Sequence, residues 1–362
     1  MKIITEEILT ELIKTHGGIE NYLKDLMKVL KEDFSRWQEF NKIPRPSMQV
    51  PGGVLELMPI CDSKYYTFKY VNCHPKNPQT GLMTVVATGQ LSRIDTGYPL
   101  MFSEMTILTA LRTAATTALA TDSMAKKNAK VHAIIGTGAQ SEFLVAALKL
   151  VRDIKEVRYF DVDSRAMDKF EKNMKNSSFK LTRCADVEAA VKGADIITTC
   201  TACKAQVDVL KNDWIKSGVH INALGGDTVG KTELEFSILS RGKIAVEYFD
   251  QCIIEGEIQR FSKKEGKKKV YAELHELFTG KKNGRDSDTE ITLYDSVGVA
   301  IEDYSALRLT YELANKYNLG GELNFTPALS DPKNLISLLE SNYQTKKIKL
   351  YGNHRRLSEA RH

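Results

Sequence analysis

Gly136, Gly138 and Asp161 have the types and the spacing of a nucleotide-binding site. The two glycines follow an apolar run at 131–135, and Asp161 directly follows the next expected strand at 156–160. Gly136 permits a tight turn, and Gly138 lets the backbone approach a pyrophosphate, to which the following helix presents unpaired N–H groups. A carboxylate at the position of Asp161 can accept hydrogen bonds from the adenosine ribose hydroxyls. The pattern predicts a dinucleotide site, and it favours NAD because a carboxylate repels a 2′-phosphate.

Two features of this motif leave alternatives open. The third glycine of the fingerprint is replaced by Ser141, which predicts slightly looser packing of the helix on the strand. Arg165 lies close to Asp161 in the sequence and leaves NADP possible. A glycine turn in an ordinary α/β domain is the alternative interpretation, but the strand, helix and acid around the turn favour a nucleotide site.

Asp227 and Arg112 are further candidates for chemistry. Asp227 follows two glycines at the end of an expected strand, where residues of a doubly wound sheet face the cofactor. Arg112 lies among alanines and threonines, so its charge requires an anion or a carboxylate partner. The expected strand ends carry Thr201, Gly225, Gly226, Asp227, Ser296 and Val297.

Alternating strands and helices position most of these residues. Short apolar runs predict parallel strands, and longer runs at helical spacing predict helices between them. The expected strands are 131–135, 156–160, 180–182, 195–199, 218–224, 243–247 and 291–295, and helices are expected at 139–151 and 186–193. This order predicts a doubly wound Rossmann domain.

The first hundred residues have a different pattern. An amphipathic helix at 19–40 precedes strand-like segments at 44–60, 65–72, 82–91 and 98–103, with turns at Pro51–Gly53 and Asp95–Gly97. A helix capped by Ser103 and a last helix at 301–317 complete this part, and the charged segment 259–288 is expected to cross the surface. We therefore predict an α+β substrate-binding and dimerisation domain at 1–126 and 302–362, and an NAD-binding domain at 127–301.

Composition excludes several other classes of protein. The apolar and charged fractions, 42% and 27%, are those of a globular protein, and no apolar run reaches the length of a membrane-spanning helix. The net charge is +5, but the sequence contains no basic module with interleaved aromatic residues, which would indicate nucleic-acid binding. The Cys200–Cys203 pair has no second pair to complete a zinc site, so no metal is expected. Cysteine use and the acidic N-terminus predict a cytoplasmic protein without a secretion signal.

Seven motifs together resemble the ornithine cyclodeaminase/mu-crystallin family over nearly the whole chain. They are Asp33–Trp37, Glu56–Pro59, Phe68–Asn72 with His74-Pro75, Ala110–Thr116, Gly136–Phe143, Gly225–Leu234 and Tyr294–Gly298. The resemblance implies a homodimer joined through the β-rich domain. It also implies that L-ornithine is converted to L-proline and ammonia by hydride removal to NAD⁺, cyclisation by the δ-amine and return of the hydride.

The resemblance also implies roles for individual residues. Arg45, Lys69 and Arg112 would hold the substrate α-carboxylate, Glu56 would assist proton transfer near the amines, and Asp227 would face the δ-amine as acid and base. Val297 would touch the substrate. The cofactor would lie against Thr84, Arg112, Gly136, Gly138, Ala139, Gln140, Asp161, Thr201, Gly225, Gly226, Asp227, Thr228, Lys231 and Ser296.

Other functions remain open on the sequence alone. A ketimine reductase or an amino-acid dehydrogenase would share Arg45, Lys69 and the Rossmann unit, and a crystallin-like small-ligand binder would be non-catalytic. Taken singly, Arg45, Lys69 and Glu56 could be ordinary surface residues. The enzymes among these alternatives differ from a cyclodeaminase in the residue that contacts a side-chain amine of the substrate, and Asp227 is the candidate for that contact.

Overall fold

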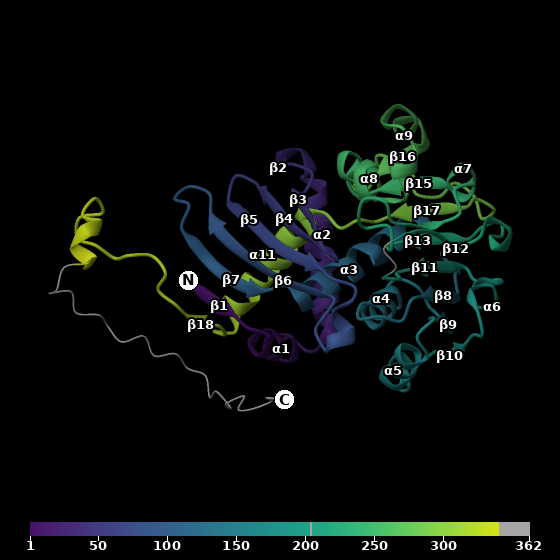
Figure 1. Cartoon of the computed structure of the whole chain (residues 1–362), viewed down its shortest axis with the longest axis horizontal. Helices are drawn as coiled ribbons and strands as arrows, with labels where there is room; N and C mark the ends of the chain where they lie inside the picture. Colours follow the sequence, from purple (N-terminus) through teal and green to yellow (C-terminus); the bar gives the residue numbers. More distant parts are fainter. Residues whose placement is uncertain (203–204, 340–362) are drawn as a thin grey trace.

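Two sheets and their covering helices build the protein, as Figure 1 shows. The computed structural model describes residues 1–202 and 205–339. The N-terminal part of the chain forms a mixed, mostly antiparallel sheet, and the middle forms a parallel sheet; each has eight strands. No helix in the described part of the chain is both long and apolar enough to cross a membrane.

The parallel sheet is a doubly wound sheet, as predicted. Its strands are β8 (Val131–Ile135), β9 (Glu156–Phe160), β10 (Lys180–Arg183), β11 (Ile196–Thr199), β13 (His220–Ala223), β15 (Lys243–Val246), β16 (Val270–Glu273) and β17 (Thr292–Asp295). They lie in the order β10-β9-β8-β11-β13-β17-β15-β16. The order reverses between β8 and β11, and ligands of such sheets bind outside the carboxyl ends of the strands at this reversal.

Short helices and a small two-stranded sheet surround the parallel sheet. The helices are α4 (Ser141–Leu148), α5 (Ser164–Met174), α6 (Val187–Val191), α7 (Ile238–Arg241), α8 (Phe249–Glu255), α9 (Lys263–Lys269) and α10 (Leu274–Phe278). Short 3-10 helices lie at η3 (Asn212–Trp214) and η4 (Glu257–Arg260), and β12 (Gln206–Leu210) pairs with β14 (Thr232–Leu234).

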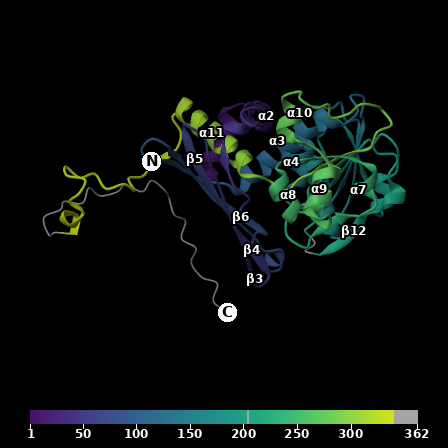
Figure 2. The same ribbon diagram turned by 90° about the horizontal axis from the view of Figure 1, so that it is seen from above.

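The antiparallel sheet presents one buried and one exposed face. Its strands are β1 (Lys2–Ile4), β2 (Asn41–Lys42), β3 (Ser47–Val50), β4 (Gly53–Cys61), β5 (Tyr65–Cys73), β6 (Val85–Arg93), β7 (Pro99–Glu104) and β18 (Gly321–Glu322). The hairpins predicted at Pro51–Gly53 and Asp95–Gly97 are present, and Gly97 has the positive φ that such a turn requires. The helices α1 (Glu6–Thr15), α2 (Ile19–Ser35) and α11 (Ala300–Lys316) lie on the sheet's buried side, where α11 packs on β4, β5 and β6 (Figure 2).

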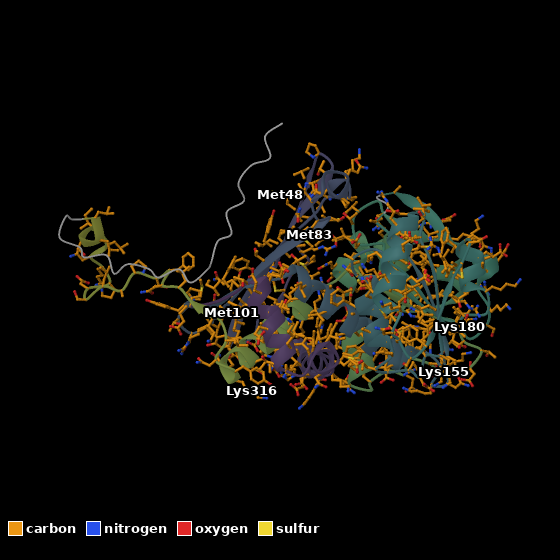
Figure 3. All side chains as sticks on the ribbon, turned by 90° about the horizontal axis from the view of Figure 1, so that it is seen from below. Met48, Met83, Met101, Lys155, Lys180 and Lys316 are labelled. Atoms are coloured by element: carbon orange, nitrogen blue, oxygen red, sulfur yellow. The ribbon has the colours of Figure 1, made fainter. Side chains whose placement is uncertain are left out.

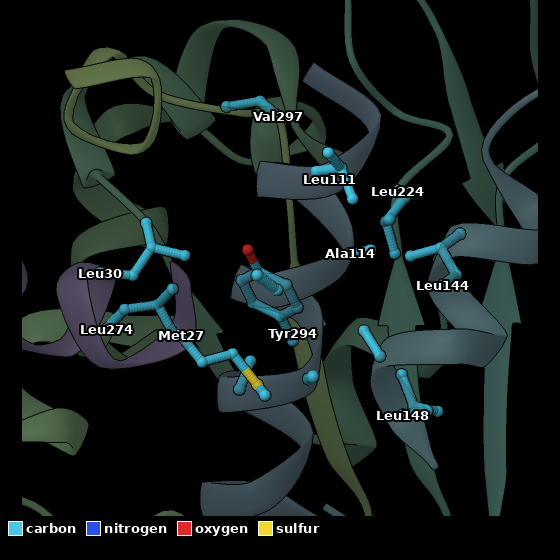
Figure 4. Packing of buried hydrophobic residues seen from close by; sticks show 14 of the residues in the cluster. Met27, Leu30, Leu111, Ala114, Leu144, Leu148, Leu224, Leu274, Tyr294 and Val297 are labelled. Atoms are coloured by element: carbon cyan, nitrogen blue, oxygen red, sulfur yellow. The ribbon is translucent and has the colours of Figure 1, made fainter. Parts of the chain in front are cut away.

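Helix α3 (Thr106–Met124) joins the two sheets. It packs against α2 on one side and α4 on the other, and Figure 4 shows Leu111 and Ala114 between Met27 and Leu144. Its alanines and threonines are buried almost all round, because small side chains let neighbouring backbones approach from every side. The helix therefore carries Arg112 into the region between the two sheets.

Three expectations about this architecture are wrong. Ser103 does not cap α3, because it lies in β7 and the Glu104 carboxylate accepts from the N–H groups of Thr106 and Ile107 instead. The N-terminal part contains β1 and α1 as well as the expected single helix. The segment 259–288 does not simply cross the surface: β16 extends the parallel sheet, and α10 buries Leu274. Most of its lysines lie in α9, and the apolar residues directly after that helix are packed.

Aromatic side chains connect the two sheet units away from the cavity. Trp37, in the 3-10 helix η1 (Trp37–Glu39), stacks on His275 of α10 with ring centroids 5.4 Å apart. Tyr248 meets the same indole edge-on, and Phe34 of α2 meets Phe278 of α10. Burial lowers the pKa of His275, so its ring is neutral near pH 7 and packs as an aromatic side chain.

Candidate active site

A cavity lies between the two sheets, at the carboxyl ends of the parallel strands. Half of the predicted site residues line it: Arg45, Glu56, Lys69, Arg112, Gln140, Asp227, Thr228, Ser296 and Val297. The rest of its lining is Val54, Val71, Asn72, Cys73, Val85, Thr109, Thr113, Leu224 and Gly298. Residues far apart in the sequence are thus brought together at the point where the strand order of the sheet reverses.

The glycine turn fits a phosphate-bearing cofactor. Gly136 has φ +98°, and a Cβ there would lie 2.7 Å from the carbonyl oxygen of Cys200. A Cβ on Gly138 would meet no atom within 4 Å, so the outer side of this turn is open to a ligand. Helix α4 begins at Ser141, and the hydroxyl of this residue donates to the Gly138 carbonyl at 2.8 Å. Serine in place of the third glycine therefore ties the helix to the turn.

Asp161 supports the turn from the end of β9. One carboxylate oxygen accepts from the backbone N–H of Thr137 at 2.6 Å, and the other accepts from the N–H of Asp163 at 3.0 Å. These bonds fix the carboxylate at the mouth of the turn, which is the position expected of a ribose ligand.

The glycines before Asp227 lie against buried carboxylates. A Cβ on Gly225 would overlap the Glu233 carboxyl group, and a Cβ on Gly226 would lie 2.9 Å from Oε1 of Glu257. Glu233 also accepts from the N–H of Thr201 at 3.0 Å, and Glu257 accepts from the N–H of Glu233 at 2.7 Å. The protein's own acids thus explain why this loop needs glycine.

Arg45 is enclosed between the two sheet units. Its Nε lies 3.0 Å from Oε1 of Glu56 on β4, and its Nη2 lies 2.8 Å from Oε2 of Glu255 on α8. The guanidinium also donates to the carbonyls of Asp227 at 2.7 Å and Val297 at 3.0 Å. Burial alone would lower the pKa of Arg45, but the two carboxylates raise it above its ordinary value, so the charge is retained.

Lys69 and Arg112 share one carboxylate. Asp303 lies 2.8 Å from Nζ of Lys69 and 3.2 Å from Nε of Arg112, while Glu302 pairs with Nη1 of Arg112 at 2.5 Å. Glu302 and Asp303 are thus the carboxylate partners that Arg112 requires. Gly298, with φ +75°, leaves room for the Arg112 guanidinium, because a Cβ there would lie 2.4 Å from Nη1. Burial and the neighbouring Arg112 charge lower the pKa of Lys69 to about 8.

Several polar atoms around the cavity are buried without a hydrogen-bond partner in the described structure. They are Oε1 of Glu302, Oδ2 of Asp303 and the hydroxyl of Thr109. Native structures satisfy nearly all such groups. A ligand with both carboxylate and amine groups fits this set, because donors and acceptors are both available.

Asp227 is partly exposed to solvent. Its side chain is 44% exposed, and one carboxylate oxygen lies 3.1 Å from Nζ of Lys231. Lys231 is buried and donates to the carbonyl of Thr201 at 2.9 Å. Burial alone would lower the pKa of Lys231, but Asp227 and Glu233 raise it, so it stays charged. Asp227 therefore lies at the open side of the cavity, within reach of solvent.

Glu247, directly after β15, holds the 296–298 loop in place. This buried carboxylate accepts from the hydroxyls of Tyr294 and Ser296, at 2.7 and 2.6 Å, and from the N–H groups of Val297 and Gly298. The carbonyl of Val297 then accepts from Arg45. Through this loop, Glu247 of the parallel sheet is connected to the guanidinium group of Arg45.

Comparison with known proteins agrees with this geometry. The family model "Ornithine cyclodeaminase/mu-crystallin family" matches residues 11–318. The chain belongs to this family. It is 47% identical over 322 residues to an ornithine cyclodeaminase from Brucella suis biovar 1, and the match covers 89% of each chain.

Solved structures of the family have the same fold. An archaeal alanine dehydrogenase dimer with bound NAD is 34% identical, with a TM-score of 0.82 and coverage of 90% of this chain and 99% of that one. A lysine cyclodeaminase, solved for its recognition of L-lysine, L-ornithine and L-2,4-diaminobutyric acid, is 25% identical. Its TM-score is 0.88, and the match covers 93% of this chain and 99% of that one. The predicted Rossmann fold with a second domain is confirmed, and NAD is the cofactor to which the glycine turn is suited.

Not every predicted residue lies at the cavity. Gly136, Gly138, Ala139, Asp161, Thr201, Gly225, Gly226 and Lys231 lie along the carboxyl edge of the parallel sheet, where a long cofactor would extend. Thr84 precedes β6, is outside the cavity lining, and its carbonyl accepts from the N–H of His74 at 2.8 Å. Cys203 lies outside the described residues. Among the residues that the structure describes, no group of three potential metal ligands is found.

Four buried acids of the site carry no role in the sequence motifs. Glu247, Glu255, Glu302 and Asp303 each contact a predicted site residue or its loop. Glu247 could have been found, because it ends an expected buried strand as Asp161 does. Glu302 and Asp303 have no such signal, because they are ordinary acids in the first turn of a helix until the fold places them beside Arg112.

Proposed function

We propose that the protein converts L-ornithine to L-proline and ammonia, with NAD as a cofactor that is regenerated in each cycle. The observation that carries this proposal is the charge of the cavity lining, which includes three cations and the carboxylates of Glu56 and Asp227. Identity of 47% to an ornithine cyclodeaminase supports the same substrate. The lysine cyclodeaminase was solved for its recognition of diamino acids that include L-ornithine, and this supports the proposal that the cavity accepts a diamino acid.

Arg45, Lys69 and Arg112 hold the α-carboxylate in this proposal. Their donors are shared with buried carboxylates of the protein, and charge-assisted hydrogen bonds from the two guanidinium groups and the ammonium would orient the substrate carboxylate. Glu56, beside Arg45 on the same face of the sheet as Lys69, lies where the α-amine would follow the carboxylate. Val297 closes the apolar side.

Asp227 acts as acid and base toward the δ-amine. An alkylammonium has a pKa of about 10.4, so releasing its proton at pH 7 costs about 4–5 kcal/mol at 1.36 kcal/mol per unit. A carboxylate beside the amine binds the ammonium and can accept its proton as the amine attacks the Cα imine. The open position of Asp227 lets this proton pass to solvent, while Lys231 fixes the orientation of its carboxylate.

Most of the cofactor residues lie along the carboxyl ends of the parallel strands. Bound NAD supplies oxidation and reduction by accepting a hydride from Cα and returning it to the cyclic imine. Gly136, Gly138, Ala139 and Gln140 cradle its pyrophosphate, Asp161 binds its ribose, and Thr84, Arg112, Thr201, Ser296, Lys231 and the 225–228 loop position the remainder. We assign residues 127–301 to this NAD-binding domain, and residues 1–126 and 302–362 to the substrate domain, of which 340–362 lie outside the described residues.

We further propose a homodimer that forms through the outer face of the antiparallel sheet. Several outward residues of β4, β5 and β6 are apolar and partly exposed, and Leu57, Tyr70 and Val86 are 40%, 42% and 44% exposed. Met48 and Met83, labelled in Figure 3, are 73% and 57% exposed and lie at the β3 end of this face. A contiguous apolar sheet face of this kind marks a protein interface, and the archaeal relative is a dimer.

The test is incubation of the protein with NAD⁺ and L-ornithine. We expect proline and ammonia in equal amounts without net accumulation of NADH, because the hydride returns to the product. L-Norvaline, which has the same carbon chain without the δ-amine, is the matched control and should give no proline. Net NADH and a 2-oxo acid from ornithine would instead indicate an amino-acid dehydrogenase, and no turnover at all would indicate a ligand binder.

The affinity of the site for carboxylates should fall at alkaline pH. The pKa of Lys69, lowered to about 8, means that its charge is present below pH 8 and lost as the pH rises through that value. A bound carboxylate favours the charged amine, so the dissociation constant of L-proline should rise above about pH 8 by up to about tenfold per pH unit. Titration of the NADH-loaded protein with proline from pH 6.5 to 9.5 measures this rise.

Lys69→Arg is the control for this titration. Arginine keeps its charge throughout the range, so the variant should lose the alkaline rise even if its affinity is weaker at every pH. An equal rise in both proteins would show that a group other than Lys69 titrates.

A further inference from the structure

The segment 324–339 extends away from the body of the protein. In Figures 1 and 2 the yellow chain leaves the antiparallel sheet and lies apart from both sheet units. Its start is fixed, because β18 pairs with β1 and the N–H of Leu323 donates to the carbonyl of Met1 at 3.0 Å. Beyond this point the hydrogen bonds found in the described arm join residues of the arm to each other, such as Asn334 to Asp331.

The arm is apolar where it is folded. Its 3-10 helix η5 (Leu335–Leu339) has the sequence Leu-Ile-Ser-Leu-Leu and buries none of its residues. Leu335, Ile336 and Leu339 are 60%, 64% and 83% exposed, and Phe325 is 64% exposed. Isolated exposed apolar residues are common, but a helical turn built almost entirely of them marks a contact surface.

We propose that the segment 324–339, here called the C-terminal arm, docks on a second copy of this chain. The proposal rests on the dimer proposed above. The arm starts at β18, the edge strand of the same sheet whose outer face is proposed as that interface. Sixteen residues reach up to about 50 Å when extended, which is enough to cross a partner's sheet.

The arm lies beyond the segment that the family model matches. The family model ends at residue 318. The catalytic cavity is complete without the arm, because its described lining ends at Gly298. A role in holding two protomers together therefore leaves the chemistry of each cavity intact.

Two truncations separate the arm from the remaining tail. A chain that stops after Asn324 lacks the arm, and a chain that stops after Glu340 keeps it and serves as the control. We expect the first to raise the dimer dissociation constant, measured by sedimentation velocity over a dilution series, about 100-fold, because several aliphatic side chains lose their burial. The control should behave as the full chain does.

Point variants protect this test from effects of truncation. Leu335→Ser, Ile336→Ser and Leu339→Ser together should weaken the dimer as the truncation does, whereas Lys333→Ser with Asn334→Ser in the same arm should not. A photo-crosslinking residue at Ile336 should yield a product of twice the chain mass. Crosslinks confined to one chain, or a product with an unrelated protein, would overturn docking on a second copy.

The outcomes distinguish the two proposals. If the full chain and the Asn324 truncation are dimers of equal stability, the arm proposal fails and the dimer stands. If the full chain is a monomer at micromolar concentration, both fail. Proline formation is followed separately, so the catalytic proposal is judged on its own result.

Discussion

The variant Asp227→Asn is expected to lose nearly all proline formation while it keeps its fold and its affinity for NAD. The asparagine side chain has the same shape and can still accept a hydrogen bond from Lys231, so packing should survive. It loses the negative charge and the basic oxygen, and loss of a positioned acid–base group lowers rates by about 10²–10⁴-fold. Steady-state assays of proline and ammonia measure this loss.

A single-turnover experiment locates the step that fails. Absorbance of NADH without proline would place Asp227 after the first hydride transfer, and absence of NADH would place it before that transfer. We expect the former, because Asp227 is assigned to the δ-amine. Asp213→Asn, an exposed aspartate in η3, is the matched control. Near-normal turnover of the Asp227 variant would remove this residue from the mechanism and favour an amino-acid dehydrogenase.

The second large effect is expected for Arg45→Ala. This change removes a charged partner of the substrate carboxylate and leaves Glu56 and Glu255 buried and unpaired. Truncation of one partner of a buried charge pair costs about 2–5 kcal/mol, so the KM for ornithine should rise at least about 30-fold. The melting temperature should also fall, because Arg45 joins carbonyls and carboxylates of both sheet units.

Substrate binding and stability are separated by a second variant. Arg45→Lys keeps the charge but loses the planar fork of donors, so it should recover stability more than ornithine affinity. The KM for NAD should change little in either variant, and Arg183→Ala, on the far side of the parallel sheet, should behave as the wild type. An unchanged KM for ornithine in Arg45→Ala would show that the carboxylate is bound elsewhere.

The parallel sheet could be predicted almost strand for strand. Buried parallel strands are continuous apolar runs, so 131–135 and 156–160 are found with their observed ends. The β16–α10 segment could not be predicted in this way, because the lysines of 263–269 outweigh the few apolar residues after them. Only contact with α2 shows that Leu274 and Phe278 are core residues.

The site divides along similar lines. Residues at strand ends, such as Asp161 and Asp227, are predictable because the fold class fixes where strand ends lie. The acids that hold Arg45 and Arg112 are not, because the pairs join positions about two hundred residues apart. The exposure of Asp227 was also not predictable, because it depends on how far the antiparallel sheet covers the cavity.

Trp37 gives the protein a built-in optical reporter. The chain has two tryptophans. Trp214 is half-buried in η3 at the outside of the parallel unit, whereas the indole of Trp37 is 5% exposed and stacked against rings from the opposite unit. The emission of Trp37 therefore comes from a dry aromatic environment that exists only while the two units are in contact. Intrinsic fluorescence can thus follow closure of the molecule without any label.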